Sequence, residues 1–234
     1  ILRHSVALAV SGRSTPVDAL TGAPVADLLL LPARALTYAK IRFDQRSIET
    51  LKQNLGKLED KLTRVLCWSA TWDMLRDAEL SASDFIEITK AGLQGEDDVT
   101  TVSTLGAQIG GAIEIYASDK NRDALRESAA NTITSLLDAA KPGSDLQLQY
   151  ARILTSLAHT PTQASKIRSM LNGELQGLVV DADLRWTLLT SLVERGLATR
   201  DEVDAELKRD NTLTGQLAHE RCLAAFPNKE AKER

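Results

Sequence analysis

The residues that could do chemistry in this chain are few and scattered. His219 and Glu220 begin a stretch that starts like the zinc-binding helix motif His-Glu-x-x-His, but position 223 is Leu. Because one imidazole cannot replace two ligands one helical turn apart, we interpret this match as chance. His4 and His159 have no neighbour in sequence that suggests a site, so we expect surface or structural roles for them. The sequence therefore predicts no catalytic residue and no metal ligand.

Motifs for phosphate binding and acyl transfer are also missing. The sequence has no Gly-x-Gly-x-x-Gly, no Walker loop and no Gly-x-Ser-x-Gly elbow. Gly110 and Gly111 lie inside a helical pattern, where close helix packing explains them better than a ligand. Residues 96–98 (Glu-Asp-Asp) lack the alternating oxygen ligands of a calcium loop, and a helix start favoured by the helix dipole explains them better.

Composition and charge exclude several function classes. The 234 residues are 43% hydrophobic and 26% charged, which is enough to bury a core in one large domain or two unequal ones. The net charge of -4 and the absence of a basic stripe argue against nucleic acid as a partner. Cys67 and Cys222 lie too far apart in sequence for a disulfide framework or metal knuckle, which suits a reducing compartment. The apolar run at 28–31 is too short to span a bilayer, so we expect a cytoplasmic protein with no membrane partner.

The elements that must position these residues change type near Asp44. Before it, Val6, Leu8 and Val10 alternate with smaller or polar residues, and recurrent Gly and Pro predict about three or four strands. After it, the apolar period is helical and capping signals recur. We therefore predict a strand segment followed by a helical domain, with residues 1–43 in the first and residues 44–234 in the second.

Apolar periodicity and capping residues predict about ten helices in the second part. Their expected starts lie near Ser47, Lys61, Ala82, Val99, Asn121, Ser144, Thr162, Ala182, Arg200 and Leu213. Helix pairs recur about every 35 to 45 residues, which is the period of HEAT-like and armadillo-like arrays. The predicted fold is thus mainly α, a HEAT/armadillo-like superhelix. A compact irregular bundle stays open, because the repeats share a period rather than letters.

One predicted helix, over residues 61–79, is unusual because it carries two of the three tryptophans. Val65, Trp68, Trp72 and Leu75 fall on one broad face, since steps of three and four residues return to nearly the same angle. Two interpretations remain for this helix: a packing element within the first repeats, or an inter-domain helix as well.

Three segments carry a resemblance to a known family. They are LTYAKIRFD (residues 36–44), LCWSATWDM followed by RDAE (within residues 66–79) and DADLRW (residues 181–186). They resemble the C-terminal region of bacterial aminopeptidase N, of the actinobacterial type, and the match in order and spacing extends along nearly the whole chain. That family consists of zinc metallopeptidases of the gluzincin class. The resemblance implies that residues 1–43 end a β-sandwich and that residues 44–234 belong to a helical domain related to that of the endoplasmic-reticulum aminopeptidases.

The resemblance also implies a function and its limits. The family's zinc helix, distal glutamate ligand and Gly-x-Met-Glu-Asn segment belong to an upstream domain, and none occurs in this sequence. We therefore expect the non-catalytic C-terminal portion of an aminopeptidase that removes N-terminal residues from peptides, inactive alone, with zinc held by the parent's catalytic domain. That catalytic domain and peptides are the expected partners. The helical part is expected to enclose the active-site chamber. Arg185 is the predicted substrate contact, through a peptide carboxylate, and an ion pair within the domain is the alternative.

Two features leave room for another interpretation. The family has an acidic cluster before Leu-Thr-Tyr, where residues 32–35 read Pro-Ala-Arg-Ala, and the strand segment is short for a sandwich. The chain begins at Ile1 and ends in a polar run, so we expect a piece of a longer polypeptide. The alternative function is a free-standing helical-repeat scaffold that binds a protein partner, which needs no upstream zinc motif.

Overall fold

A computed structural model describes residues 4–32, 34 and 37–228. The α-helices are α1 (Gln45–Asn54), α2 (Lys61–Arg76), α3 (Ala82–Leu93), α4 (Val99–Gly111), α5 (Asp119–Ala139), α6 (Asp145–Leu157), α7 (Pro161–Leu171), α8 (Ala182–Glu194), α9 (Arg200–Arg209) and α10 (Leu213–Ala224). The shorter elements are two 3₁₀ turns, η1 (Asp18–Leu20) and η2 (Leu55–Lys57), and a π-helix, η3 (Ala112–Tyr116). The prediction of a mainly helical chain with ten helices is confirmed for the described residues.

The helices begin where a side chain satisfies an amide of the first turn. In every α-helix except α5, the N-cap side chain accepts a hydrogen bond from the amide three residues further on. Thr160 with Gln163 and Thr199 with Glu202 form complete capping boxes. Because capping depends on residues close in sequence, the predicted helix starts lie within two residues of the observed ones.

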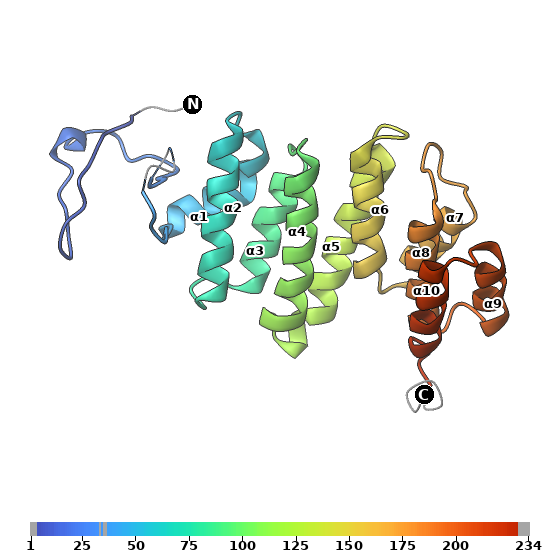
Figure 1. The fold of residues 1–234 in the computed structure, drawn as a ribbon. Coiled ribbons are helices and arrows are strands. Elements are labelled where there is room, and N and C mark those ends of the chain that lie inside the picture. The colour runs from blue at the N-terminus through green and yellow to red at the C-terminus, as the bar shows by residue number, and fades with distance from the viewer. Residues whose placement is uncertain (1–3, 33, 35–36, 229–234) are drawn as a thin grey trace.

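The helices stack in two layers along the molecule (Figure 1). In one layer, α1 packs on α3, α3 on α5 and α5 on α7; in the other, α4 packs on α6, α6 on α8 and α8 on α10. Helices adjacent in sequence also pack against each other, as α5 does with α6 and α9 with α10. Because α1 and α10 lie at opposite ends, the arrangement is a stack rather than a compact bundle (Figure 1).

An apolar core fills the space between the two layers. Side chains with no exposed surface occur all along it, and they include Phe85 of α3, Ile109 of α4, Ile133 of α5, Leu154 of α6 and Leu188 of α8. Complete burial of one such side chain contributes about 1.5–3 kcal/mol. Because this core continues from helix to helix, it holds successive repeats together.

The predicted helix with two tryptophans is α2, and the prediction that Val65 shares its buried face is wrong. Trp68 is 3% exposed, as expected of a packing residue, and lies against Gly92 of α3. The Trp72 ring centroid lies 5.3 Å from that of Phe85. Val65, by contrast, is 44% exposed and does not share the buried face. The side of α2 that carries Val65 is therefore left partly uncovered.

The largest difference between the structure and the sequence prediction lies in the N-terminal segment. No described residue is in a β-strand, so the β-sandwich remnant predicted for residues 1–43 is not seen. Val6, Leu8 and Val10 are 40%, 38% and 77% exposed. A strand needs a neighbouring strand for its backbone hydrogen bonds, and the described part of this segment has no such partner. The first α-helix begins at Gln45, while the division into two domains stays a prediction.

Ion pairs attach this segment to the end of α2. Lys40 Nζ lies 2.7 Å from an Asp77 carboxylate oxygen, and Arg42 pairs with the same carboxylate. The hydrogen bond from Lys40 lowers the pKa of Asp77. Of the two stretches singled out in the sequence, residues 32–35 lie partly outside the described residues, and in the terminal polar run residues 229–234 lie outside them.

Candidate functional site

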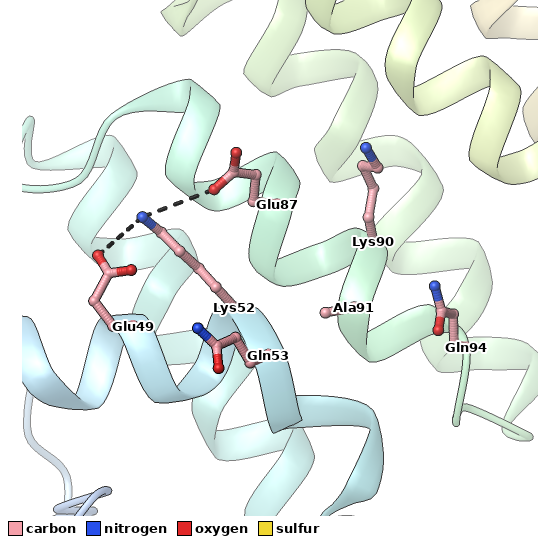
Figure 2. Close-up of a pocket in the computed structure, with 7 residues that line it drawn as sticks. All are labelled: Glu49, Lys52, Gln53, Glu87, Lys90, Ala91 and Gln94. Atoms are coloured by element: carbon pink, nitrogen blue, oxygen red, sulfur yellow. Dashed lines mark hydrogen bonds and ion pairs between the residues drawn. The ribbon is translucent and has the colours of Figure 1, made fainter.

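A cleft of about 410 Å³ lies between α1 and α3 (Figure 2). It is lined by Glu49, Lys52 and Gln53 of α1, by Glu87, Lys90 and Ala91 of α3, and by Gln94, the residue that follows α3. These positions are spaced by three or four residues on each helix, so each helix contributes one face. The cleft walls are therefore polar and charged.

Lys52 neutralises the acidic end of this cleft. Its Nζ lies 2.6 Å from Asp84, 3.1 Å from Glu49 and 3.8 Å from Glu87, and Figure 2 shows the last two contacts. The hydrogen bond to Asp84 raises the pKa of Lys52. Burial raises the pKa of Asp84, but hydrogen bonds from Lys52 and Ser81 outweigh that effect and leave it below its ordinary value. Lys52 thus joins α1 to α3.

The other end of the cleft offers hydrogen-bonding groups. Lys90 Nζ donates to Ser128 Oγ of α5 at 2.7 Å, and Gln94 also lines the cleft. No serine, cysteine or histidine is among the residues that line the cleft, and its charged and amide side chains are groups that could bind a polar ligand. The sequence analysis missed this cleft, because charges three residues apart are typical of any solvated helix face.

A second hollow, of about 400 Å³, lies where the turn after α2 meets the start of α5. Leu75, Leu80 and Tyr116 contribute apolar surface to it. Tyr116 belongs to η3, and its ring meets Trp72 edge-on with centroids 6.0 Å apart. Arg122 of α5 donates to main-chain oxygens at both ends of η3, which stabilises the π-turn.

Arg185, the predicted substrate contact, lies on α8 and faces α9. Its Nε donates to Glu206 Oε1 at 2.8 Å and its Nη2 to Oε2 at 2.7 Å, while Nη1 donates to the Leu171 carbonyl at 3.1 Å. The side chains of Arg185 and Glu206 are 18% and 6% exposed. The hydrogen bonds with Glu206 raise the pKa of Arg185. The structure thus brings Arg185 into an ion pair within the domain, and its contact with peptide stays a prediction.

His219 lies between two carboxylates. Its Nε2 lies 2.8 Å from Asp204 Oδ1 and its Nδ1 lies 3.3 Å from Glu220 Oε1. Among the described residues, no group of three or more His, Cys, Asp and Glu could hold a metal ion.

Burial raises the pKa of the Cys67 thiol to about 12, so it stays protonated at neutral pH. No described helix is long and apolar enough to cross a bilayer.

Comparison with known sequences places these features in a family. The profile described as ERAP1-like C-terminal domain matches residues 28–234, a range that includes all ten α-helices. The chain belongs to this family. The ERAP1-like region therefore contains the cleft between α1 and α3 as well as Arg185 and His219.

This ERAP1-like chain is also similar to part of a bacterial aminopeptidase. Aminopeptidase N of Streptomyces lividans is 37% identical to it over 229 residues, which are 97% of the chain and 27% of that protein. The resemblance to bacterial aminopeptidase N is confirmed. The chain spans about a quarter of the length of this relative.

Proposed function

We propose that this chain is the C-terminal helical domain of a zinc-dependent aminopeptidase of the aminopeptidase N type. The observation that carries the proposal is the 37% identity to Streptomyces lividans aminopeptidase N along 97% of the chain. Because the chain spans only 27% of that relative, we assign catalysis to the remainder of a longer parent polypeptide. Zinc bound there would activate a water molecule for hydrolysis of the N-terminal peptide bond.

The role of the helical domain is to enclose the active-site chamber of the parent. A HEAT/armadillo-like superhelix suits this role, because stacked helices form a broad wall from repeated, firmly packed units. The continuous core and the capped helix starts support such a wall. The partners in this proposal are the catalytic domain of the same polypeptide and the peptides in the chamber.

The contacts of Arg185 give it a structural role in this proposal. All three of its guanidinium nitrogens donate within the domain, to Glu206 and to the carbonyl of Leu171. A peptide carboxylate could use only the remaining N–H groups.

The cytoplasm is the proposed compartment, and the free thiols of Cys67 and Cys222 support it.

An activity comparison tests the proposal. The native protein is captured from its source with an antibody against this chain and assayed on aminoacyl anilides, with and without a zinc chelator; the 234-residue chain is assayed beside it. We expect chelator-sensitive cleavage by the native protein, and neither cleavage nor bound zinc for the chain alone. Native protein without activity would contradict the assignment to an aminopeptidase. Stoichiometric zinc in the chain alone would contradict the placement of the metal.

A further inference from the structure

Two of the sequence stretches that carry the family resemblance meet at the end of α2. Lys40 and Arg42 belong to LTYAKIRFD, the first stretch, and RDAE, which ends the second, contains Asp77 and Glu79. Lys40 Nζ donates to both carboxylate oxygens of Asp77, at 3.0 Å and 2.7 Å. Arg42 pairs with Asp77 and also with Glu79. Two cations of the N-terminal segment thus share two carboxylates of the turn that follows α2.

The turn that carries these carboxylates is held in one shape by its backbone. The amide of Glu79 donates to the Met74 carbonyl at 2.8 Å, and the amide of Ala78 donates to the Leu75 carbonyl at 3.1 Å. This pair of hydrogen bonds is the Schellman pattern of a helix end. Ala78 has a φ of 61°, in the left-handed region that glycine adopts more readily than alanine. Contacts around the turn therefore keep it in this conformation, and they fix the spacing of the carboxylates on either side of Ala78.

The residue after Arg42 anchors the N-terminal segment in the core. Phe43 is 7% exposed and belongs to the apolar core, and its amide donates to Met74 Sδ at 3.4 Å. Asp44 then caps α1, because its side chain accepts a hydrogen bond from the amide of Ser47. Between residues 40 and 44, the chain is thus attached first by ion pairs, then by a buried side chain and finally by a helix cap.

We propose that residues 40–43 and residues 77–79 form a rigid elbow, which fixes the direction in which the N-terminal segment leaves the helical stack. Exposed ion pairs stabilise little one at a time, but this network surrounds a buried anchor and shares its charges. Asp77 is the partner of both cations, so its neutralisation should open the elbow locally while the helices stay folded. The consequence for a parent enzyme rests on the proposed function: the elbow holds the helical wall in place relative to the upstream catalytic domain.

Trypsin cleavage of the 234-residue chain tests the elbow. Trypsin cuts after arginine, and cleavage between Arg42 and the buried Phe43 requires the backbone to open locally. The rate at Arg42 is compared with the rate at Arg13, an exposed site in the same segment. In Asp77→Asn we expect this relative rate to rise about three- to tenfold. About 1 M NaCl should raise it in the wild type and change it less in the variant.

Asp73→Asn is the matched control for Asp77→Asn. Asp73 lies one turn earlier on α2, and the side chains of Asp73 and Asp77 are 31% and 30% exposed. The cation nearest to Asp73 is Arg76, at 4.0 Å. Glu79→Gln is a second variant, which removes the other carboxylate that Arg42 contacts and should also raise the relative rate. Cleavage after Arg42 that is no faster in these two variants than in Asp73→Asn would overturn the elbow.

The same substitution in the parent polypeptide separates the elbow from the proposed function. We expect Asp77→Asn to lower kcat/KM for long peptides more than for an aminoacyl anilide, because only a long peptide reaches the helical wall. Equal effects on both substrates would contradict the consequence for the wall. A parent without aminopeptidase activity would contradict the proposed function, whereas the cleavage after Arg42 would still decide the elbow.

Discussion

Arg64 of α2 and Glu96 of the turn before α4 form an ion pair that is almost fully shielded from water. Arg64 Nε lies 3.0 Å from Glu96 Oε2, and the two side chains are 5% and 2% exposed. Arg64 Nη1 also donates to the Leu58 carbonyl at 2.7 Å. Glu96 Oε1 accepts from the amides of Asp97 and Asp98 at 3.1 Å and 2.9 Å. The pair thus ties the loop before α2 to the turn between α3 and α4.

Glu96→Gln should destabilise the chain strongly. Glutamine keeps the size and one acceptor oxygen, but the buried guanidinium of Arg64 loses its counter-charge. Removing one partner of a buried ion pair costs about 3–5 kcal/mol. Urea unfolding measures the free energy of unfolding. Lys61→Gln is the control, because Lys61 and its partner Asp97 are 64% and 68% exposed. An effect of Glu96→Gln as small as that of the control would contradict this prediction.

Arg185→Lys should also lose stability, although it keeps the positive charge. An ammonium group cannot form the two parallel hydrogen bonds that the guanidinium makes with Glu206. We expect a loss of about 1–3 kcal/mol in the free energy of unfolding. Arg152→Lys is the comparison, since Arg152 pairs with Asp183 through one nitrogen and both side chains are more exposed, at 36% and 71%. Unchanged stability of Arg185→Lys, with a raised KM of the parent enzyme for long peptides, would instead favour the substrate role.

Asp84→Asn should cost stability at neutral pH but not in strong acid. The pKa of Asp84 in the folded chain lies below its ordinary value of 3.8, so its ionised form stabilises the fold. That stabilisation is complete above the ordinary pKa and is lost as the pH falls through the lowered one. Melting temperatures of the wild type and of Asp84→Asn should therefore differ at pH 7 and converge below 3.8. A difference that persists at the lowest pH at which the chain folds would exclude Lys52 pairing as its cause.

Two glycine substitutions should have opposite effects. A Cβ at Gly92 would lie 2.6 Å from the Trp68 ring, so Gly92→Ala forces the indole to move and should cost about 1–3 kcal/mol. A Cβ at Gly110 would have no atom within 4 Å. Because alanine favours a helix more than glycine does, Gly110→Ala should gain up to about 1 kcal/mol. Thermal unfolding of both variants measures the two effects on stability. A stabilised Gly92→Ala would show that the α2–α3 contact is looser than described.

Local features of the fold could be predicted from the sequence, and features made by distant residues could not. Thr199 with Glu202 gave a correct helix start, because a capping box depends on neighbours in the chain. Val6 and Leu8 did not form the predicted strand, because alternation describes one strand and says nothing of its partner.

For the candidate sites, too, single residues could be selected from the sequence, but their partners on other helices could not. Arg185 was selected from the sequence, but its partner Glu206 comes from another helix and meets it only when α8 packs near α9. The cleft between α1 and α3 likewise requires two helices to lie side by side, so neither helix alone indicates it. The spacing of His219 argued against a zinc motif, whereas its contact with Asp204 depends on the pairing of α9 with α10.

The mass of the native polypeptide tests the central claim most directly. Cell extract is prepared under protection from proteolysis and blotted with an antibody raised against this chain. If the chain is the C-terminal domain of an aminopeptidase N type enzyme, the band should be several times heavier than 25.5 kDa. A single band near 25.5 kDa would contradict the claim and indicate a free-standing helical-repeat protein.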